Sequence, residues 1–347
     1  MMLWFVGLGI SGPDSLSTKT QDMIRTSDIV YLEQFTSPMS EQDTGKIKTL
    51  VKGEFKLAPR WLVEDGKEIL ENAKSKNVAL LSLGDPYIAT THIELRTRAI
   101  AEKIQTATVH ASSITTSLIG ECGLHYYKVG KTVTIMSSIQ STTAYYAIYE
   151  NLRVGNHTVI LLEYDQSRSF FLDPKDALSS LIASEKEQAR RVVSGSTFVV
   201  VASRIGMPEQ KVIAGNLESL LGMDFGAPPH SIVIPGALHF TESDALRVLA
   251  RCIDEPSDNT SKIEKISAQM MKKYIPMVKR ALDQITPYYK DKQEFAGVLE
   301  NADLYVRDAE KFFEQGKDEL AILSIGYADG LVDALRIAKG IEPELNS

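Results

Sequence analysis

The chain has 347 residues, which is enough for two or three domains that each bury a core. Its hydrophobic content of 44% and charged content of 24% are typical of a globular protein in water. A formal net charge of -7 argues against a surface built to neutralise phosphates, so we expect no direct nucleic-acid binding. No apolar run approaches the roughly 20 residues that span a bilayer, so we expect no membrane partner.

The two cysteines, Cys122 and Cys252, lie far apart and show neither a CxxC motif nor the spacing of metal ligands. We therefore expect no disulfide framework and no metal, and a reducing cytoplasmic location. The apolar N-terminus, MMLWFVGLGI, lacks a basic start and runs directly into glycines. This pattern indicates a first strand rather than a signal peptide.

The first strand, predicted at Leu3–Val6, ends in the pattern GxGxxG at Gly7–Gly12. This pattern is known from dinucleotide-binding loops. Here Pro13 follows the last glycine, and the helix N-cap candidates lie only at positions 15 to 18, so the helix starts too late for a nicotinamide or flavin site. The sequence still predicts a glycine loop in which a ligand comes close to the backbone.

The stretch after a predicted helix at Leu62–Ala73 organises the first half of the chain. Val78–Leu83 is apolar at consecutive positions, which is typical of a strand buried on both faces of a parallel sheet. Gly84, Asp85 and Pro86 then end the strand, and a helix is predicted from about Ile93. Ligands of open α/β sheets bind beyond the carboxyl ends of the strands, so this turn is a candidate site for a small molecule. An ordinary strand-to-helix turn is the alternative.

A third strand, predicted at Thr108–Ala111, runs into Ser112–Ser117, where five of the six residues carry a hydroxyl group. Capping of the following helix needs one or two of them, so the excess favours a binding loop. Because helices alternate with the strands, the three loops are expected at the same edge of one parallel sheet. Their convergence predicts a ligand site.

The second half of the chain divides into a further α/β region and a helical tail. We predict domains at 1–130 and 131–253, a polar linker at 254–261 and a three-helix bundle at 262–347. His230 follows two prolines and precedes an apolar strand, and it is expected to line a ligand site rather than to catalyse.

Several motifs in this order carry a resemblance to a known family. The stretches VGLGISGPD, LSLGDPYIATTHIELRTRA, VHASSI, VVASRIG and FGAPPHSIVIPGALH resemble the diphthine synthases of the archaeal type, over about Met2–Ala250. That family belongs to the tetrapyrrole-methylase-like class of methyltransferases. The tail from Ser261 resembles a small archaeal helical domain of unknown function.

The resemblance implies two α/β domains with the ligand cleft between them, S-adenosylmethionine as the methyl donor, and a homodimer. It also implies translation elongation factor 2 as substrate, methylated on the amine of its 3-amino-3-carboxypropyl-histidine to give diphthine. Carried over position by position, the donor-binding residues would be Ile10, Asp85, Ile88, Ser113, Ile114, Leu162, Ile205 and His230.

Several points stay open at this stage. No catalytic residue is assigned: Asp85 is expected to bind the donor, and Glu33, Glu163 and Asp165 are weaker candidates for contacting the cationic amine. The number of methyl groups, the proton acceptor and the partner of the helical tail also stay open. The alternatives are a precorrin-type tetrapyrrole methylase of the same fold and a nicotinamide-dependent oxidoreductase. The long ATTHIELR stretch and the late first helix, respectively, argue against them.

Overall fold

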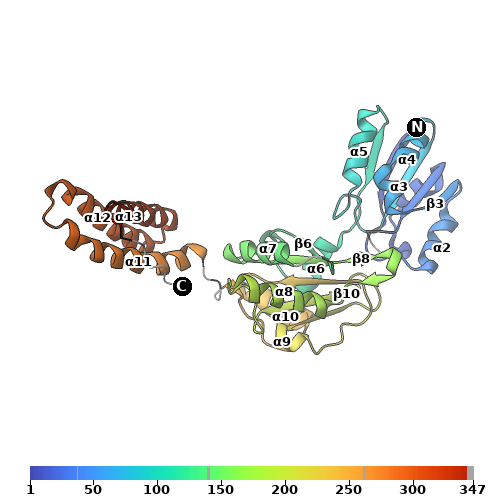
Figure 1. Cartoon of the computed structure of the whole chain (residues 1–347). Helices are drawn as coiled ribbons and strands as arrows, with labels where there is room; N and C mark the ends of the chain where they lie inside the picture. The colour runs from blue at the N-terminus through green and yellow to red at the C-terminus, as the bar shows by residue number, and fades with distance from the viewer. Residues whose placement is uncertain (37, 139–140, 261–262, 264, 342–347) are drawn as a thin grey trace. The chain divides into compact units, whose positions relative to one another are not determined.

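The computed structural model describes residues 1–36, 38–138, 141–260, 263 and 265–341. Its internal contacts divide the chain into two compact units, Met1–Ile263 and Glu264–Ser347. Figure 1 shows the first unit from blue to yellow and the second in orange and red. The bounds predicted for the α/β domains, linker and tail stay predictions, and residues 261, 262, 264 and 342–347 lie outside the described part.

The first sheet has five parallel strands in the order β3-β2-β4-β1-β5. The central strand β4 shows the expected burial on both faces. Val78 and Leu80 enter the core on one side of the sheet, while Ala79 and Leu81 enter the core on the other. The strands of this sheet are β1 (Met2–Gly7), β2 (Ile29–Glu33), β3 (Glu54–Ala58), β4 (Asn77–Ser82) and β5 (Thr106–Val109).

The helices of this half begin and end largely as predicted. The late start of the first helix is confirmed, because Ser17 caps it by accepting a hydrogen bond from the backbone N–H of Thr20 at 3.1 Å. A single helix over Leu62–Ala73 is wrong: Gly66 adopts φ +64°, a left-handed conformation that ends one helix before the next begins. The helices are α1 (Thr18–Thr26), α2 (Glu41–Leu50), α3 (Arg60–Asp65), α4 (Lys67–Ser75), α5 (His92–Ala101) and α6 (Ile114–Cys122), with a 3₁₀ turn η1 (Pro13–Ser15).

The strand expected at Thr108–Ala111 begins and ends two residues earlier, at Thr106–Val109. Its ladder with β1 stops at the pair Val6 and Val109. As a result, His110 and Ala111 belong to the loop that follows the strand, at the edge where the ligand site was predicted.

The second sheet is mixed, with the order β13-β11-β10-β12-β7-β6. The strand predicted at 157–164 is wrong at its end: the chain leaves the sheet after Leu162, and Tyr164 pairs instead with Phe171 in a short hairpin. Helix α6 packs with this sheet's core through Leu118 and Ile119. The strands are β6 (Val133–Ile135), β7 (Thr158–Leu162), β8 (Tyr164–Asp165), β9 (Phe170–Phe171), β10 (Phe198–Ser203), β11 (Lys211–Asn216), β12 (His230–Ile234) and β13 (Arg251–Cys252).

The helices of this part include α10 (Phe240–Leu249), which the sequence pattern did not single out. The others are α7 (Thr142–Arg153), α8 (Pro174–Gln188) and the short α9 (Leu217–Leu220), with 3₁₀ turns η2 (Tyr126–Lys128) and η3 (Gln166–Arg168). Both cysteines are free thiols in the structure.

A buried carboxylate anchors α10. Glu242 is fully buried and accepts hydrogen bonds from the backbone N–H of His125 at 2.8 Å and from Nε2–H of His157 at 2.9 Å. It also forms an ion pair with Lys128. Burial alone would raise the pKa of Glu242, but these donors lower it to about 2. The carboxylate therefore joins α10 to β7 and to the segment that follows α6.

The second unit is a three-helix bundle of α11 (Ile266–Tyr289), α12 (Ala296–Glu314) and α13 (Asp318–Lys339). A 3₁₀ turn, η5 (Gln293–Phe295), comes directly before α12. Its core is built from apolar side chains of all three helices, as the helical spacing predicted. The hydroxyl of buried Tyr289 donates to the carbonyl of Leu335 at 2.8 Å, which joins the ends of α11 and α13. Among the helices of the described residues, none is both long and apolar enough to cross a membrane.

Replacing the anchor tests its contribution to stability. We expect Glu242→Gln to lower the free energy of unfolding by about 3–5 kcal/mol, because it leaves Lys128 without its buried counter-charge. Urea unfolding followed by circular dichroism measures the change. The matched control is Glu255→Gln, whose side chain is 71% exposed and should leave the midpoint unchanged. Equal midpoints for the two variants would contradict the anchoring role.

Candidate functional site

The three predicted loops meet at the carboxyl edge of the first sheet. Gly9 and Gly84 exchange two backbone hydrogen bonds, with N···O distances of 3.2 and 2.8 Å. The hydroxyl of Ser112 accepts a hydrogen bond from the backbone N–H of Ile10 at 3.4 Å. The predicted convergence is therefore confirmed.

The approach of these loops depends on a missing side chain. A Cβ atom on Gly7 would lie 2.7 Å from the carbonyl oxygen of Gly84 and 2.8 Å from the Cβ of Ala111. Both distances are shorter than real Cβ contacts. Glycine at this position therefore lets the ends of β1, β4 and β5 close on one another.

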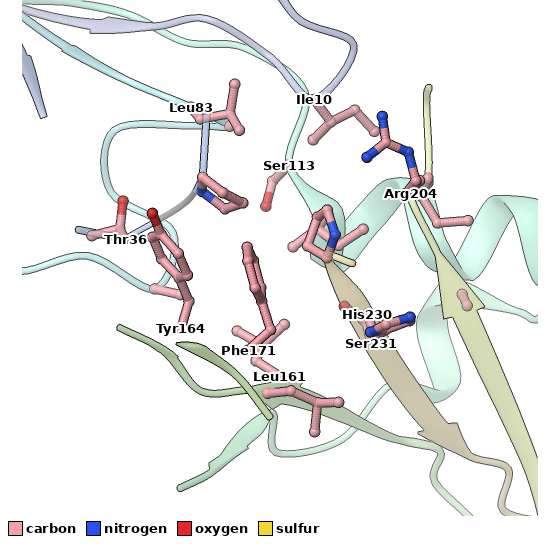
Figure 2. A pocket seen from close by; sticks show the side chains of 18 of the residues that line it. Ile10, Thr36, Leu83, Ser113, Leu161, Tyr164, Phe171, Arg204, His230 and Ser231 are labelled. Carbon is pink, nitrogen blue, oxygen red and sulfur yellow. The ribbon is translucent and has the colours of Figure 1, made fainter. Parts of the chain in front are cut away.

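A cavity of about 1000 Å³, counted with its open mouth, adjoins these loops in the first unit. Figure 2 shows Ile10 and Ser113 on one side of it, and Phe171 and His230 on the other. All eight residues predicted to bind the donor line this cavity: Ile10, Asp85, Ile88, Ser113, Ile114, Leu162, Ile205 and His230.

Asp85 is held in a fixed orientation by three donors. It is 8% exposed; its Oδ1 accepts from the N–H of Tyr87 at 3.0 Å, and its Oδ2 accepts from Nδ1 of His110 at 2.8 Å and from the N–H of Ala111 at 3.3 Å. The turn predicted to form the floor of the site thus presents an oriented carboxylate to the cavity.

His230 offers an acceptor that the protein does not use. Its Nε2 donates to the carbonyl of Gly226 at 3.1 Å, whereas its buried Nδ1 has no partner among the described residues. Burial lowers the pKa of His230, so the ring is neutral near pH 7. With the proton on Nε2, Nδ1 keeps a buried lone pair that no described residue meets.

The three carboxylates considered for contact with an amine already accept hydrogen bonds from other groups of the protein. Glu33 is 3% exposed and accepts from the N–H groups of Phe35 and Thr36, both at 3.1 Å; burial raises its pKa. Asp165 accepts from Arg168 at 2.6 Å, and hydrogen bonds from Ser167 and Arg168 lower its pKa to about 2. Of the three, Glu163 alone lines the cavity.

Glu163 also accepts hydrogen bonds from other residues. The backbone N–H and hydroxyl of Ser137 both donate to it at 2.6 Å, and Arg168 donates at 3.1 Å. Burial raises the pKa of Glu163, but these donors together bring it below the ordinary value. A carboxylate held in this way is a poor proton acceptor.

Part of the cavity wall was not predicted from the sequence. Tyr164 and Phe171 of the β8–β9 hairpin line it, as does Arg204 beyond β10. The local signal for this hairpin is the polar stretch DQSRS between aromatic residues in YDQSRSFF, but it does not place the hairpin at the cavity. Among the described residues, no group of three or more His, Cys, Asp or Glu is placed to hold a metal ion.

Comparisons with known proteins agree with this architecture. The family model Tetrapyrrole (Corrin/Porphyrin) Methylases matches residues 2–221, and the model Protein of unknown function (DUF357) matches residues 273–341. The diphthine synthase of Methanosarcina acetivorans is 36% identical over 257 residues, which are 72% of this chain and 96% of that protein. That of Methanocaldococcus jannaschii is 34% identical over 258 residues, 73% of this chain and 100% of the relative.

A solved structure gives the same result in three dimensions. A crystal structure of diphthine synthase superimposes with a TM-score of 0.66 at 30% identity, covering 76% of this chain and 100% of that one. The fold and the cavity therefore define a tetrapyrrole-methylase-class methyltransferase. Within that class, the chain belongs to the diphthine synthase family and is a methyltransferase of diphthamide biosynthesis. The precorrin-type alternative is not favoured, because the matching relatives are diphthine synthases over nearly their whole length.

Filling the space at Gly7 tests whether loop contact supports the cavity. We expect Gly7→Ala to destabilise the protein by about 1–3 kcal/mol, because the new methyl group overpacks against backbone. Thermal unfolding measures the loss. The control is Gly120→Ala in α6, where a Cβ meets no atom within 4 Å, so the helix should be unchanged or slightly stabilised. An unchanged melting temperature for Gly7→Ala would contradict the close packing.

A buried histidine supports the turn beneath the cavity. His92 is 1% exposed and its Nδ1 donates to the carbonyl of Pro86 at 3.1 Å, while its Nε2 has no partner in the described part of the chain. Burial lowers the pKa of His92 to about 4. The folded protein therefore keeps this ring neutral at pH values where the unfolded chain protonates it.

This difference makes stability depend on pH. Above the unfolded pKa of about 6.5 the contribution is fully present, and it is lost as pH falls toward 4, because the unfolded state then binds more protons. We expect His92 to account for a loss of about 2 kcal/mol between pH 7 and pH 5. Urea unfolding at both pH values should show a smaller difference for His92→Phe than for the parent. Equal slopes would refute this assignment.

Proposed function

We propose that this chain transfers methyl groups from S-adenosylmethionine to the amine of the 3-amino-3-carboxypropyl-histidine of translation elongation factor 2, giving diphthine. The observation that carries the proposal is the chemistry of the cavity wall: two carboxylates held by hydrogen bonds, Asp85 and Glu163, and the neutral imidazole of His230, among mostly apolar side chains. Such a wall suits a ligand with a cationic amine and a large apolar surface.

The residues present fit the methyl donor. The carboxylate of Asp85 would hold its ammonium group, and His230, which lines the same cavity, would contact the donor. The N–H groups at the start of α6, after Ser113, suit a carboxylate. The remaining donor contacts would be apolar, from Ile10, Ile88, Ile114, Leu162 and Ile205.

The chemistry asks little of the protein beyond positioning. The donor, when bound, supplies an electrophilic methyl group on a sulfonium, and transfer is an in-line displacement. The chain's own residues would orient the two reactants and exclude water, which together lower the barrier. The acceptor amine must also lose a proton before each attack.

The proposal extends to the setting of the reaction. The acceptor is a translation factor, so the enzyme would act in the cytoplasm, where translation takes place. It would act as a homodimer, in keeping with its family. The acidic balance of the chain, with a net charge of -7, supports a protein partner over direct nucleic-acid binding.

Mass spectrometry of the acceptor protein tests the function. Incubating archaeal elongation factor 2 that carries the aminocarboxypropyl-histidine with the enzyme and labelled donor should add methyl groups stepwise. We expect Asp85→Ala to abolish the additions, because the donor loses its oriented carboxylate. The control is Asp244→Ala on α10, whose side chain is 68% exposed and should leave the rate unchanged.

The same experiment separates the substrate from the fold. Calorimetry measures donor binding independently of turnover. Donor binding without any methyl addition to the elongation factor would contradict the assigned substrate and favour a small tetrapyrrole as the substrate. Absence of donor binding would contradict the assignment of the cavity as the donor-binding site.

A further inference from the structure

Two aromatic rings line the cavity outside the set of residues predicted to bind the donor. Tyr164 and Phe171 pair across the β8–β9 hairpin, with 4.8 Å between their ring centroids and 31° between their planes. Figure 2 shows the two rings side by side, with Phe171 on the side of His230. Because Tyr164 covers one face of the Phe171 ring, the opposite face is the one that meets the rest of the cavity.

The next ring of the same hairpin differs in its surroundings. Phe170 does not line the cavity, since successive side chains of a strand point to opposite sides. Arg168 lies over its ring, with 5.0 Å from the guanidinium carbon to the ring centroid. Among the described residues, no lysine or arginine lies over Tyr164 or Phe171 in this way. The cavity rings therefore keep their faces for a ligand.

The segment that carries the rings has an excess of negative charge. From Glu163 to Phe171 it contains two carboxylates, those of Glu163 and Asp165, and one guanidinium, that of Arg168. Arg168 pairs with both carboxylates, at 3.1 Å from Glu163 and 2.6 Å from Asp165. The face of an aromatic ring is also negative, because of its quadrupole. Charge and rings together favour a cationic ligand at this end of the cavity.

The hairpin contacts a second segment that lines the same cavity. At its tip, the side-chain amide of Gln166 donates to that of Gln34 at 2.6 Å, in the loop after β2. Thr36 and Pro38 of that loop line the cavity as well. Neither the hairpin nor this loop carries a residue of the predicted donor set. The two segments therefore form a part of the wall that a second reactant can use.

The acceptor amine is the reactant whose chemistry fits this wall. Each transfer forms one N–C bond and breaks one S–C bond, whose electrons stay on sulfur, so the positive charge moves to nitrogen. The amine then loses a proton to solvent before the next attack. Each added methyl group also removes an N–H, so hydrogen bonds from the amine become fewer. Aromatic faces still attract the methylated cation, because a cation–π contact needs no N–H.

We propose that the faces of Phe171 and Tyr164 are the subsite for the acceptor amine and hold its methylated ammonium group between successive transfers. This inference rests on the proposed function and deepens it, because it gives the acceptor its own part of the cavity wall. The chemical class of ligand is an alkylated ammonium ion.

The decisive variant removes the ring face and keeps an apolar side chain. In Phe171→Leu, with the modified elongation factor below its KM, intact mass gives the rate of each methyl addition. We expect the second and later additions to slow by about 5–30-fold, the usual range of a partly desolvated cation–π contact. The first addition should slow by less than about threefold, because the unmethylated amine keeps its hydrogen bonds. The Kd of the donor, from calorimetry, should stay within about threefold.

The matched control is the same substitution at the neighbouring ring. Phe170→Leu changes the same strand outside the cavity, so all rates should be unchanged. Phe171→Tyr keeps a ring and should recover most of the rate lost in Phe171→Leu. Pentafluorophenylalanine in place of Phe171 keeps the shape but reverses the charge of the ring face, so it should behave like Phe171→Leu. A ring that only fills space would tolerate the fluorinated residue.

The outcomes are distinguishable from failure of the proposed function. If the parent enzyme adds no methyl group to the elongation factor, the proposed substrate is wrong. If the parent adds methyl groups, equal slowing of first and later additions in Phe171→Leu overturns the subsite, as does a parent that adds only one. Parent rates with the fluorinated ring also overturn it. A loss of donor affinity of more than about tenfold would assign the rings to the donor instead.

Discussion

The paired backbones of Gly9 and Gly84 are the constraint on which the site depends. Their two hydrogen bonds hold the loop after β1 against the turn after β4, and the absence of a side chain at Gly7 permits the approach. Ile10 and Asp85 follow these glycines directly, so their places at the cavity are set by the same contact. Backbone atoms make this contact, which leaves the neighbouring side chains available for a ligand.

Most buried polar atoms near the cavity already have hydrogen-bond partners within the protein. Buried carboxylates are surrounded by hydrogen-bond donors, because an unpaired buried charge would cost several kcal/mol. The donors of Glu33 come from the loop that follows it, and two of those of Glu163 come from the distant Ser137. Two imidazoles differ: Nδ1 of His230 and Nε2 of His110 keep lone pairs that the described residues do not use.

The helical unit adds a second protein family to the first. The diphthine synthase relatives are matched over 96% and 100% of their own length by 72% and 73% of this chain, so the unit at 264–347 is additional to what those enzymes need. It has a core of its own, drawn from three helices. Its match at residues 273–341 is to a family of unknown function. The cavity and the residues proposed to bind the donor lie in the first unit.

The sequence by itself determined the features that follow from local pattern. The apolar run at Val78–Leu83 predicted a strand buried on both faces, strand and helix alternation predicted converging loops, and the motifs predicted the family and its eight cavity residues. Tertiary structure decided the rest. The early end of β5 and the hydrogen bond between Asp85 and His110, 25 residues apart, depend on strand register, as does the β8–β9 hairpin in the cavity wall. Periodicity in one segment reports which face is buried, but it carries no information about the distant residue that will lie opposite.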